Sequence, residues 1–186
     1  RLSDGGLAIY GGLIAAVFGL LFYCRRKKIP FLAFGDLVIQ GLLLGQSIGR
    51  WGNFMNVEAY GSVTDLPWRM CTQSIADELW RKGLLESEEL YFSLMDGTLG
   101  VHPTFLYESL WNLTGFFVVH FAVRRWRKFD GQLFLSYVLW YGTGRTLIES
   151  LRTDSLYLFD WQLFGQPIRV SQALSVTMVL ISALML

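Results

Sequence analysis

Residues 6–24, GLAIYGGLIAAVFGLLFYC, are nineteen residues without a charged side chain, and they run directly into the basic cluster RRKK at 25–28. A helix needs about 20 predominantly apolar residues to cross the hydrocarbon core of a bilayer. Positive charge at the end of such a run is typical of the cytoplasmic side of a membrane protein. The stretch therefore predicts a spanning helix that enters the cytoplasm at its C-terminal end.

The composition of the whole chain agrees with this interpretation. Of its 186 residues, 53% are hydrophobic and 17% are charged, whereas soluble domains carry about 25% charged residues. These values exclude a disordered chain and disfavour an ordinary soluble domain. We therefore expect an all-α fold, a polytopic transmembrane helix bundle.

Four further segments continue the pattern of apolar runs. We expect spans at about 6–24, 29–49, 104–123, 131–151 and 168–186. The second is short or broken in its last part, because the uncharged run 37–49 has only thirteen residues. The chain begins at Arg1 without a methionine, so we interpret it as a fragment whose N-terminal helices are missing.

The placement of charge sets the orientation of these spans. A second basic cluster, Arg124, Arg125, Arg127 and Lys128, follows the third span. Each basic cluster directly follows a long apolar run, so we set aside nucleic-acid binding and assign both to the cytoplasmic side. Residues 62–101 hold seven acidic and three basic side chains, which predicts a loop or helical insertion outside the cytoplasm. Within it, Ser74 followed by Asp77 and Glu78 predicts a helix start.

Glycines recur every four residues in the second span, at Gly41, Gly45 and Gly49. This spacing places glycine along one face of a helix and lets another helix approach closely. Cys24 and Cys71 are too few for a disulfide framework. We expect these two cysteines on opposite sides of the membrane.

Ionisable residues inside predicted spans are the strongest functional signal, because an unpaired charge in the bilayer is costly. Glu108 lies in the third span, and Tyr141, Arg145, Glu149 and Arg152 follow at helical spacing. At 100° per residue these four fall within about 80° of one another on a helix. One interpretation is an internal salt-bridge ladder. The other is an anion site, since a surplus guanidinium binds phosphate oxygens in a fork.

Residues 49–61, GRWGNFMNVEAYG, form the densest polar segment. Such a sequence is unsuited to a lipid-facing helix, so it is buried in protein or lines a wet cavity. A turn that caps a helix end is the alternative, but it does not account for Arg50 and Glu58 together. His102 is either a solvated loop residue or a proton carrier. His120 is interpreted as structural, and the sequence shows no metal-binding spacing.

The segment 49–61 resembles the signature GRxGNFxNxExxG of bacterial prolipoprotein diacylglyceryl transferases, with every fixed position present. The resemblance extends over essentially the whole chain. It includes GGLAIYGG at 5–12, HPTFLYES at 102–109, YGTGRTLIESLRTD at 141–154 and VSQALS at 170–175.

The resemblance implies a multi-pass enzyme of the bacterial inner membrane with seven spanning helices, five of them in this chain. Such an enzyme transfers the diacylglyceryl group of phosphatidylglycerol to the thiol of the lipobox cysteine in a preprolipoprotein signal peptide, and it releases glycerol 1-phosphate. The implied partners are this lipid, the signal peptide and the bilayer, and the active site faces away from the cytoplasm. No cofactor is implied.

Candidate site residues follow from the matched motifs. The signature contributes Arg50, Asn53, Asn56, Glu58 and Gly61, with Arg50 implied to bind phospholipid, and the fourth span contributes Tyr141 and Arg145. We count Arg50, Arg145 and Tyr10 as catalytic candidates, and we add Glu149 and His102 as substrate-binding candidates.

Two expectations refine this assignment. Tyr10 stands where some family members have histidine, and because a phenol of pKa about 10 is a weak base at neutral pH, we expect it to orient rather than accept a proton. Arg145 is expected about 10 Å deeper than Arg152, which would pair with Glu149 near the outer interface. An arginine-lined lipid or anion transporter remains the alternative function; it predicts an inverted repeat or a two-sided cavity.

Overall fold

The computed structural model describes residues 6–85, 87–152, 157–163 and 166–186, with the backbone alone for 6–10, 13, 157–163 and 166–170. Five long helices and two short ones account for most of the described chain. They are α1 (Gly6–Lys27), α2 (Phe31–Met55), α3 (Gln73–Arg81), α4 (Glu88–Met95), α5 (Thr104–Phe117), α6 (Gln132–Glu149) and α7 (Val170–Met185). The expected mostly helical fold is therefore correct.

Two small antiparallel pairs interrupt the helices. Strand β1 (Val63–Thr64) pairs with β2 (Gly100–Val101) at the two ends of the acidic segment. Strand β3 (Tyr157–Leu163) pairs with β4 (Gln166–Arg169) just before α7. Helix α5 continues as a π-helical turn, Val118–Val123, and a 3-10 turn, Arg124–Trp126.

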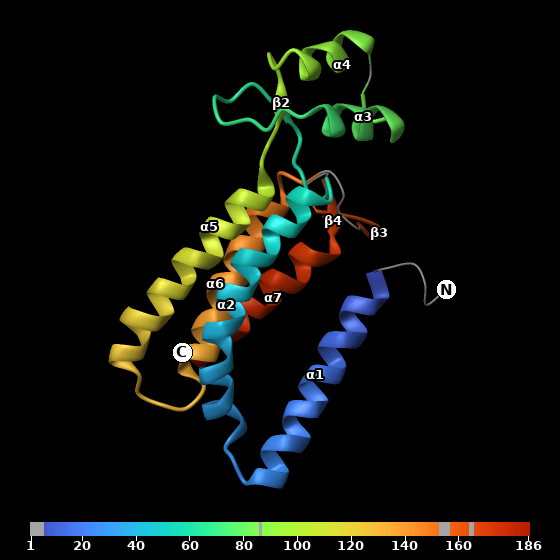
Figure 1. Cartoon of the computed structure of the whole chain (residues 1–186). Coiled ribbons are helices and arrows are strands. Elements are labelled where there is room, and N and C mark those ends of the chain that lie inside the picture. Colours follow the sequence, from blue (N-terminus) through green and yellow to red (C-terminus); the bar gives the residue numbers. More distant parts are fainter. Residues whose placement is uncertain (1–5, 86, 153–156, 164–165) are drawn as a thin grey trace.

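Helices α2, α5, α6 and α7 form a bundle in which α2 lies against α5 and α6 against α7 (Figure 1). Helix α1 diverges from the bundle and joins it through the turn before α2 (Figure 1). That turn and the loop between α5 and α6 lie at one end, while α3 and α4 form a separate unit at the other. The two basic clusters therefore share one end of the molecule, opposite the acidic segment.

The outer surface of the long helices is strongly apolar. Large side chains such as Phe18 on α1, Leu37 on α2 and Leu147 on α6 are more than half exposed. Among the described residues, α2 alone has the length and apolarity of a membrane span, and Ser171–Met185 form a shorter apolar helix. Helix α2 is continuous to Met55, so the expectation that the second span is short or broken in its last part is wrong, and the first half of the signature is helical.

The acidic segment builds its own small core instead of an open loop. Tyr60, Ile75, Leu79, Leu94 and Val101 are buried together between α3, α4 and the β1–β2 pair. The Tyr91 hydroxyl donates to Asp77 Oδ1 at 2.7 Å, which ties α4 to α3, and this bond raises the pKa of Tyr91. The helix start differs from the prediction, because Thr72 rather than Ser74 caps α3 by accepting from the backbone N–H of Ile75.

Close helix packing uses different glycines from those expected. A Cβ placed on Gly41, Gly45 or Gly49 would meet no atom within 4 Å in the described part of the chain. At the α5–α6 crossing, by contrast, a Cβ on Gly144 would lie 2.2 Å from Trp111 Nε1. The Trp111 and Trp140 rings stack with centroids 4.7 Å apart, and each indole donates to the other residue's carbonyl. Glycine is therefore required where the indoles enter this crossing.

A buried carboxylate fixes the start of α6, at the end of the bundle that holds the loop between α5 and α6. Asp36 on α2 is 2% exposed. Its two oxygens accept from the backbone N–H groups of Gly131 and Phe134, each at 2.9 Å. Arg127 Nε lies 3.3 Å from Asp36 Oδ2. Because the first N–H groups of a helix have no partner within it, Asp36 caps α6 from a neighbouring helix.

Candidate functional site

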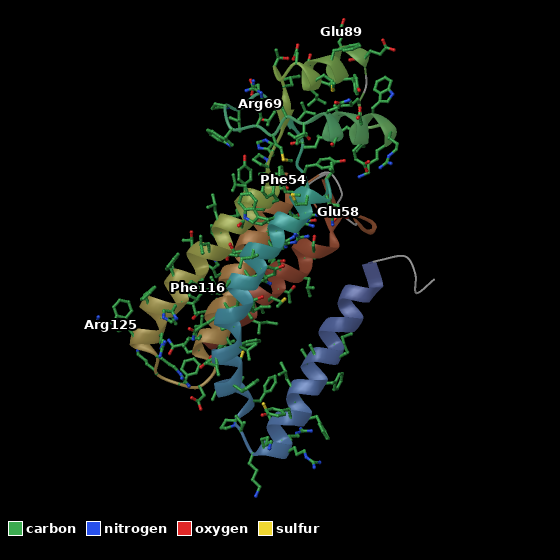
Figure 2. The ribbon with its side chains drawn as sticks, in the orientation of Figure 1. Phe54, Glu58, Arg69, Glu89, Phe116 and Arg125 are labelled. Atoms are coloured by element: carbon green, nitrogen blue, oxygen red, sulfur yellow. The ribbon has the colours of Figure 1, made fainter. Side chains whose placement is uncertain are left out.

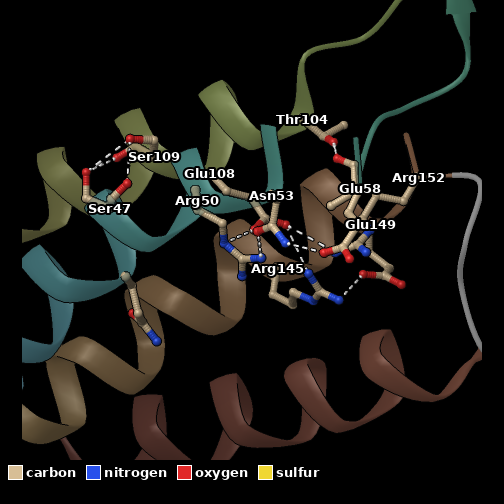
Figure 3. Close-up of polar contacts among 12 residues, drawn as sticks. Ser47, Arg50, Asn53, Glu58, Thr104, Glu108, Ser109, Arg145, Glu149 and Arg152 are labelled. Carbon is tan, nitrogen blue, oxygen red and sulfur yellow. Dashed lines mark hydrogen bonds and ion pairs between the residues drawn. The ribbon is translucent and has the colours of Figure 1, made fainter. Parts of the chain in front are cut away.

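Three arginines converge on one carboxylate, that of Glu108 on α5 (Figure 3). Arg50 Nε contacts Glu108 Oε2, Arg145 Nη1 lies 3.0 Å from Oε1, and Arg152 Nη1 lies 3.7 Å from the same oxygen. Arg145 also pairs with Glu149 at 2.7 Å. The ion cluster, defined as Arg50, Glu108, Arg145, Glu149 and Arg152, carries three positive and two negative charges.

The members of the ion cluster come from helices α2, α5 and α6 and from the turn after α6. Arg50 lies near the end of α2, Glu108 near the start of α5, and Arg145 in the last turns of α6. Ser47 and Ser109 hold α2 against α5 beside the cluster, because each hydroxyl lies 2.9 Å from the other residue's carbonyl oxygen. The cluster therefore sits at the end of the bundle that faces the α3–α4 unit.

The cluster is largely withdrawn from solvent. The side chain of Glu149 is 2% exposed, that of Glu108 7% and that of Arg145 19%. Buried ion pairs persist where further contacts compensate for the lost hydration of the charges. Here the carboxylates supply those contacts to the guanidiniums, and the surplus positive charge favours an anionic ligand.

The structure corrects our expectation for Arg152. This side chain is 12% exposed, less than Arg145, and both guanidiniums approach the same oxygen of Glu108. The expected difference in depth assumed a helix that continues through Arg152, but α6 ends at Glu149. The chain turns there, and Arg152 Nη1 comes within 3.7 Å of Glu108 Oε1.

The second half of the signature forms a tight loop after α2. Asn53 connects the cluster to Glu58, since Arg50 Nη1 donates to Asn53 Oδ1 at 3.4 Å and Asn53 Nδ2 donates to Glu58 Oε2 at 3.3 Å. Asn56 is exposed and ends the helix. Val57 and Ala59 have φ values of 56° and 53°, a left-handed conformation that is strained for residues other than glycine. Glu58 lies between these two residues, at the end of the bundle that faces the α3–α4 unit (Figure 2).

Gly61 lies where three segments meet. Its N–H donates to the carbonyl of His102, and the next N–H, that of Ser62, donates to Leu151. A Cβ on Gly61 would lie 2.7 Å from His102 Cβ and 2.9 Å from the Leu151 oxygen. The geometry therefore gives Gly61 a packing role, which joins the signature loop to the start of α5 and the end of α6.

Tyr141 faces a small cavity beside the cluster. Seven residues line it: Glu108, Trp111, Asn112, Tyr141, Gly144, Arg145 and Ile148. The Tyr141 ring stacks on that of Tyr137 with centroids 5.7 Å apart. A second hollow, of about 190 Å³, lies between the signature loop and the start of α3, and Asn53, Glu58 and Thr72 are among its lining residues.

No described contact joins the His102 side chain to the ion cluster. The His102 ring approaches Tyr107, with Nδ1 3.3 Å from the hydroxyl oxygen. Tyr10 lies on α1, but its side chain is outside the described residues. Glu108, by contrast, is not among the candidate site residues predicted from the sequence. The sequence places it inside a span, and the structure shows that it is the centre of the ion cluster. Its occurrence in HPTFLYES, inside an apolar run, was the available signal.

The sequence of this chain matches one family of known proteins over its whole length. The family model for prolipoprotein diacylglyceryl transferase matches residues 1–186. The chain belongs to this family. It is 44% identical over 182 residues to the phosphatidylglycerol–prolipoprotein diacylglyceryl transferase of Listeria monocytogenes, with 98% of the chain covered. It is 38% identical over 179 residues to the protein of the same name from Finegoldia magna, with 96% covered.

The chain spans 58% of the length of the Listeria monocytogenes relative and 60% of that from Finegoldia magna. The match nevertheless includes the segments that hold the ion cluster and the signature. The residues of the ion cluster therefore lie within the part of the chain that the relatives share.

Proposed function

We propose that the protein transfers the diacylglyceryl group of phosphatidylglycerol to the cysteine thiol of a prolipoprotein and releases glycerol 1-phosphate. The names of the relatives support the two substrates. The observation that carries the proposal on this chain is the convergence of Arg50, Arg145 and Arg152 on one buried carboxylate. A planar guanidinium binds phosphate oxygens through paired hydrogen bonds, and several in one place suit a phosphate ester.

The reaction forms one bond and breaks one. The thiolate sulfur of the acceptor cysteine attacks the glyceryl carbon that bears the phosphate, so a carbon–sulfur bond forms. The carbon–oxygen bond breaks, and its electron pair leaves on the phosphate oxygen as glycerol 1-phosphate. The thiol proton leaves the sulfur before or during attack and ends on solvent water or on the released phosphate. The acceptor provides the nucleophile, so no cysteine or serine of the enzyme needs to form a covalent intermediate.

The arginines act on both reactants in this proposal. Negative charge grows on the phosphate as the carbon–oxygen bond breaks, and guanidiniums already in place stabilise it with little rearrangement. The ordinary pKa of a thiol is about 8.5, and nearby positive charge lowers it toward neutral pH. We assign these roles to Arg50 and Arg145, which make the short contacts around Glu108.

The remaining candidates surround these two arginines. We propose that Tyr141 contacts the lipid from the cavity, that Glu149 holds Arg145, and that Asn53 and Glu58 orient Arg50. Asn56 and Gly61 shape the signature loop. Tyr10 and His102 remain proposed substrate contacts, with Tyr10 in an orienting rather than a proton-accepting role.

We further propose a multi-pass arrangement in the bacterial cytoplasmic membrane, with the cluster near the outer face. Support comes from charge at the two ends of the bundle. Arg125 and Glu89, one from each charged segment, lie at opposite ends of the molecule (Figure 2). The ion cluster lies toward the acidic end, where a secreted acceptor would be reached.

The direct test uses the full-length protein in detergent with phosphatidylglycerol and a peptide that carries a lipobox cysteine. We expect the peptide to gain the mass of one diacylglyceryl group and a cysteine-to-serine peptide to gain none. Absence of this mass gain with a correctly folded preparation would reject the transferase proposal. Movement of labelled lipid across a bilayer, without modification of the peptide, would favour a transporter.

A further inference from the structure

Glu108 uses both carboxylate oxygens on the groups that the proposed function assigns to phosphate. Arg50 contacts Oε2, and Arg145 and Arg152 approach Oε1 at 3.0 and 3.7 Å. The side chain is 7% exposed, so these contacts are little screened by water. A carboxylate in this position offers the guanidiniums what a phosphate would offer: oxygen acceptors with negative charge.

A phosphate and Glu108 cannot both occupy these donors in the arrangement seen here. With Glu108 in place, the ion cluster has three positive and two negative groups, a net charge of +1. If its carboxylate turned away, Glu149 would be the one carboxylate left within the ion cluster as defined above. An incoming phosphate would then meet a more positive site with free donors. Exchange of one anion for the other keeps the guanidiniums neutralised throughout.

Asn112 offers the displaced carboxylate a second position. It lies four residues after Glu108 on α5, one helical turn away on the same face. It is 2% exposed and lines the same cavity as Glu108, Tyr141 and Arg145. Its side-chain amide has no hydrogen-bond partner among the described residues. The amide is therefore available to donate to a carboxylate that turns into this cavity.

We propose that Glu108 is a displaceable internal counter-ion, which holds the place of the lipid phosphate and turns to the Asn112 amide when the phosphate binds. This inference rests on the proposed function and concerns how the same site admits its substrate. Glu108 is thus a positioning residue, because it acts through the arginines and not on the reacting atoms.

The proposal makes the affinity for phosphate depend on how often Glu108 is displaced. When only a fraction of the molecules is in the binding-competent state, the apparent Kd equals the intrinsic Kd divided by that fraction. A minor state commonly holds about 10% of the population or less. Removing the charge of Glu108 should therefore tighten binding of a phosphate monoester by about tenfold or more.

The test measures equilibrium binding of glycerol 1-phosphate to the full-length protein in nonionic detergent. We expect Glu108→Gln to bind this probe about tenfold more tightly than the unmodified protein. Glu89→Gln is the matched control, since it makes the same change in charge on the exposed side of α4. Asn112→Leu, of similar size but without the amide, should weaken binding severalfold and should have no such effect in the Glu108→Gln background.

Thermal unfolding supplies a second readout in case Glu108→Gln is poorly folded. Inorganic phosphate should raise the midpoint of Glu108→Gln more than that of the unmodified protein, because phosphate replaces the missing carboxylate. Unchanged or weaker binding by a folded Glu108→Gln, or no preferential rescue, would overturn the inference. Peptide modification by the unmodified protein is scored in parallel, so failure of the transferase proposal would be seen separately.

Discussion

Glu108 on α5 and Arg145 on α6 are 37 residues apart in the sequence, yet their side chains meet at 3.0 Å inside the bundle. Arg145 thereby bridges two carboxylates, because Glu149 lies one turn further along its own helix. The expected salt-bridge ladder is partly present, since Arg145 and Glu149 do pair. It is not the whole arrangement, because α5 adds Glu108 and α2 adds Arg50.

Arg145 should contribute more to transfer than Arg152. Arg145 holds shorter contacts to Glu108, at 3.0 against 3.7 Å. We expect Arg145→Ala to lower the rate constant about 100-fold or more, the loss typical of removing one preorganised donor. Arg145→Lys should also be severely impaired, because the ammonium lacks the planar fork. Rates measured in parallel with Arg152→Ala decide the order, and an inactive Arg152→Ala beside an active Arg145→Ala would invert it.

Arg50→Ala should abolish transfer and leave insertion into the membrane intact. Arg50 is contacted by both Glu108 and Asn53. It lies near the end of α2, and the insertion of this apolar helix does not depend on the Arg50 side chain. The measurement is peptide mass gain, with membrane fractionation as the control for insertion. Near-normal turnover by correctly inserted protein would contradict an anion site at this position.

Tyr10→Phe should retain measurable activity. A phenol with an ordinary pKa of about 10 is mostly protonated at neutral pH, so loss of its hydroxyl removes a hydrogen bond and not an obligatory base. Turnover is compared with that of Arg50→Ala measured in the same preparation. A loss as complete as that of Arg50→Ala would show that the hydroxyl is essential.

Cys71 should react with a membrane-impermeant thiol reagent in intact spheroplasts. This cysteine is exposed on the acidic segment, whereas Cys24 is buried near the basic end. Cys71→Ser should remove the label, which identifies the reacting thiol. Labelling that requires prior permeabilisation would place the acidic segment in the cytoplasm and would reverse the proposed orientation.

Ala59→Gly should stabilise the signature loop, whereas an alanine-to-glycine substitution within a helix destabilises that helix. Ala59 has a φ of 53°, a conformation that costs an L-residue about 1 kcal/mol or more relative to glycine. Ala76 lies within α3, where glycine is worse than alanine by about 1 kcal/mol. The thermal unfolding midpoint in detergent should therefore rise for Ala59→Gly and fall for Ala76→Gly. A decrease for both would show that the loop is not strained at Ala59.

Local features of the sequence determined much of this protein. Apolar runs and the basic clusters after them predicted the long helices and the charged ends, because hydropathy and charge are properties of contiguous residues. Helical spacing correctly placed Arg145 and Glu149 on one face, since a helix repeats every 3.6 residues. The signature at 49–61 indicated the family and singled out Arg50 without reference to any long-range contact.

The tertiary structure alone decided which helix faces meet. Glu108 becomes the centre of the cluster because α5 crosses both α2 and α6, and Asp36 caps α6 from α2. Arg152 joins the cluster because the chain turns after Glu149, and the close approach at Gly144 depends on the crossing of α5 and α6. Helix rotation, crossing angle and chain reversal depend on side chains distant in sequence, so periodicity within one segment does not specify them.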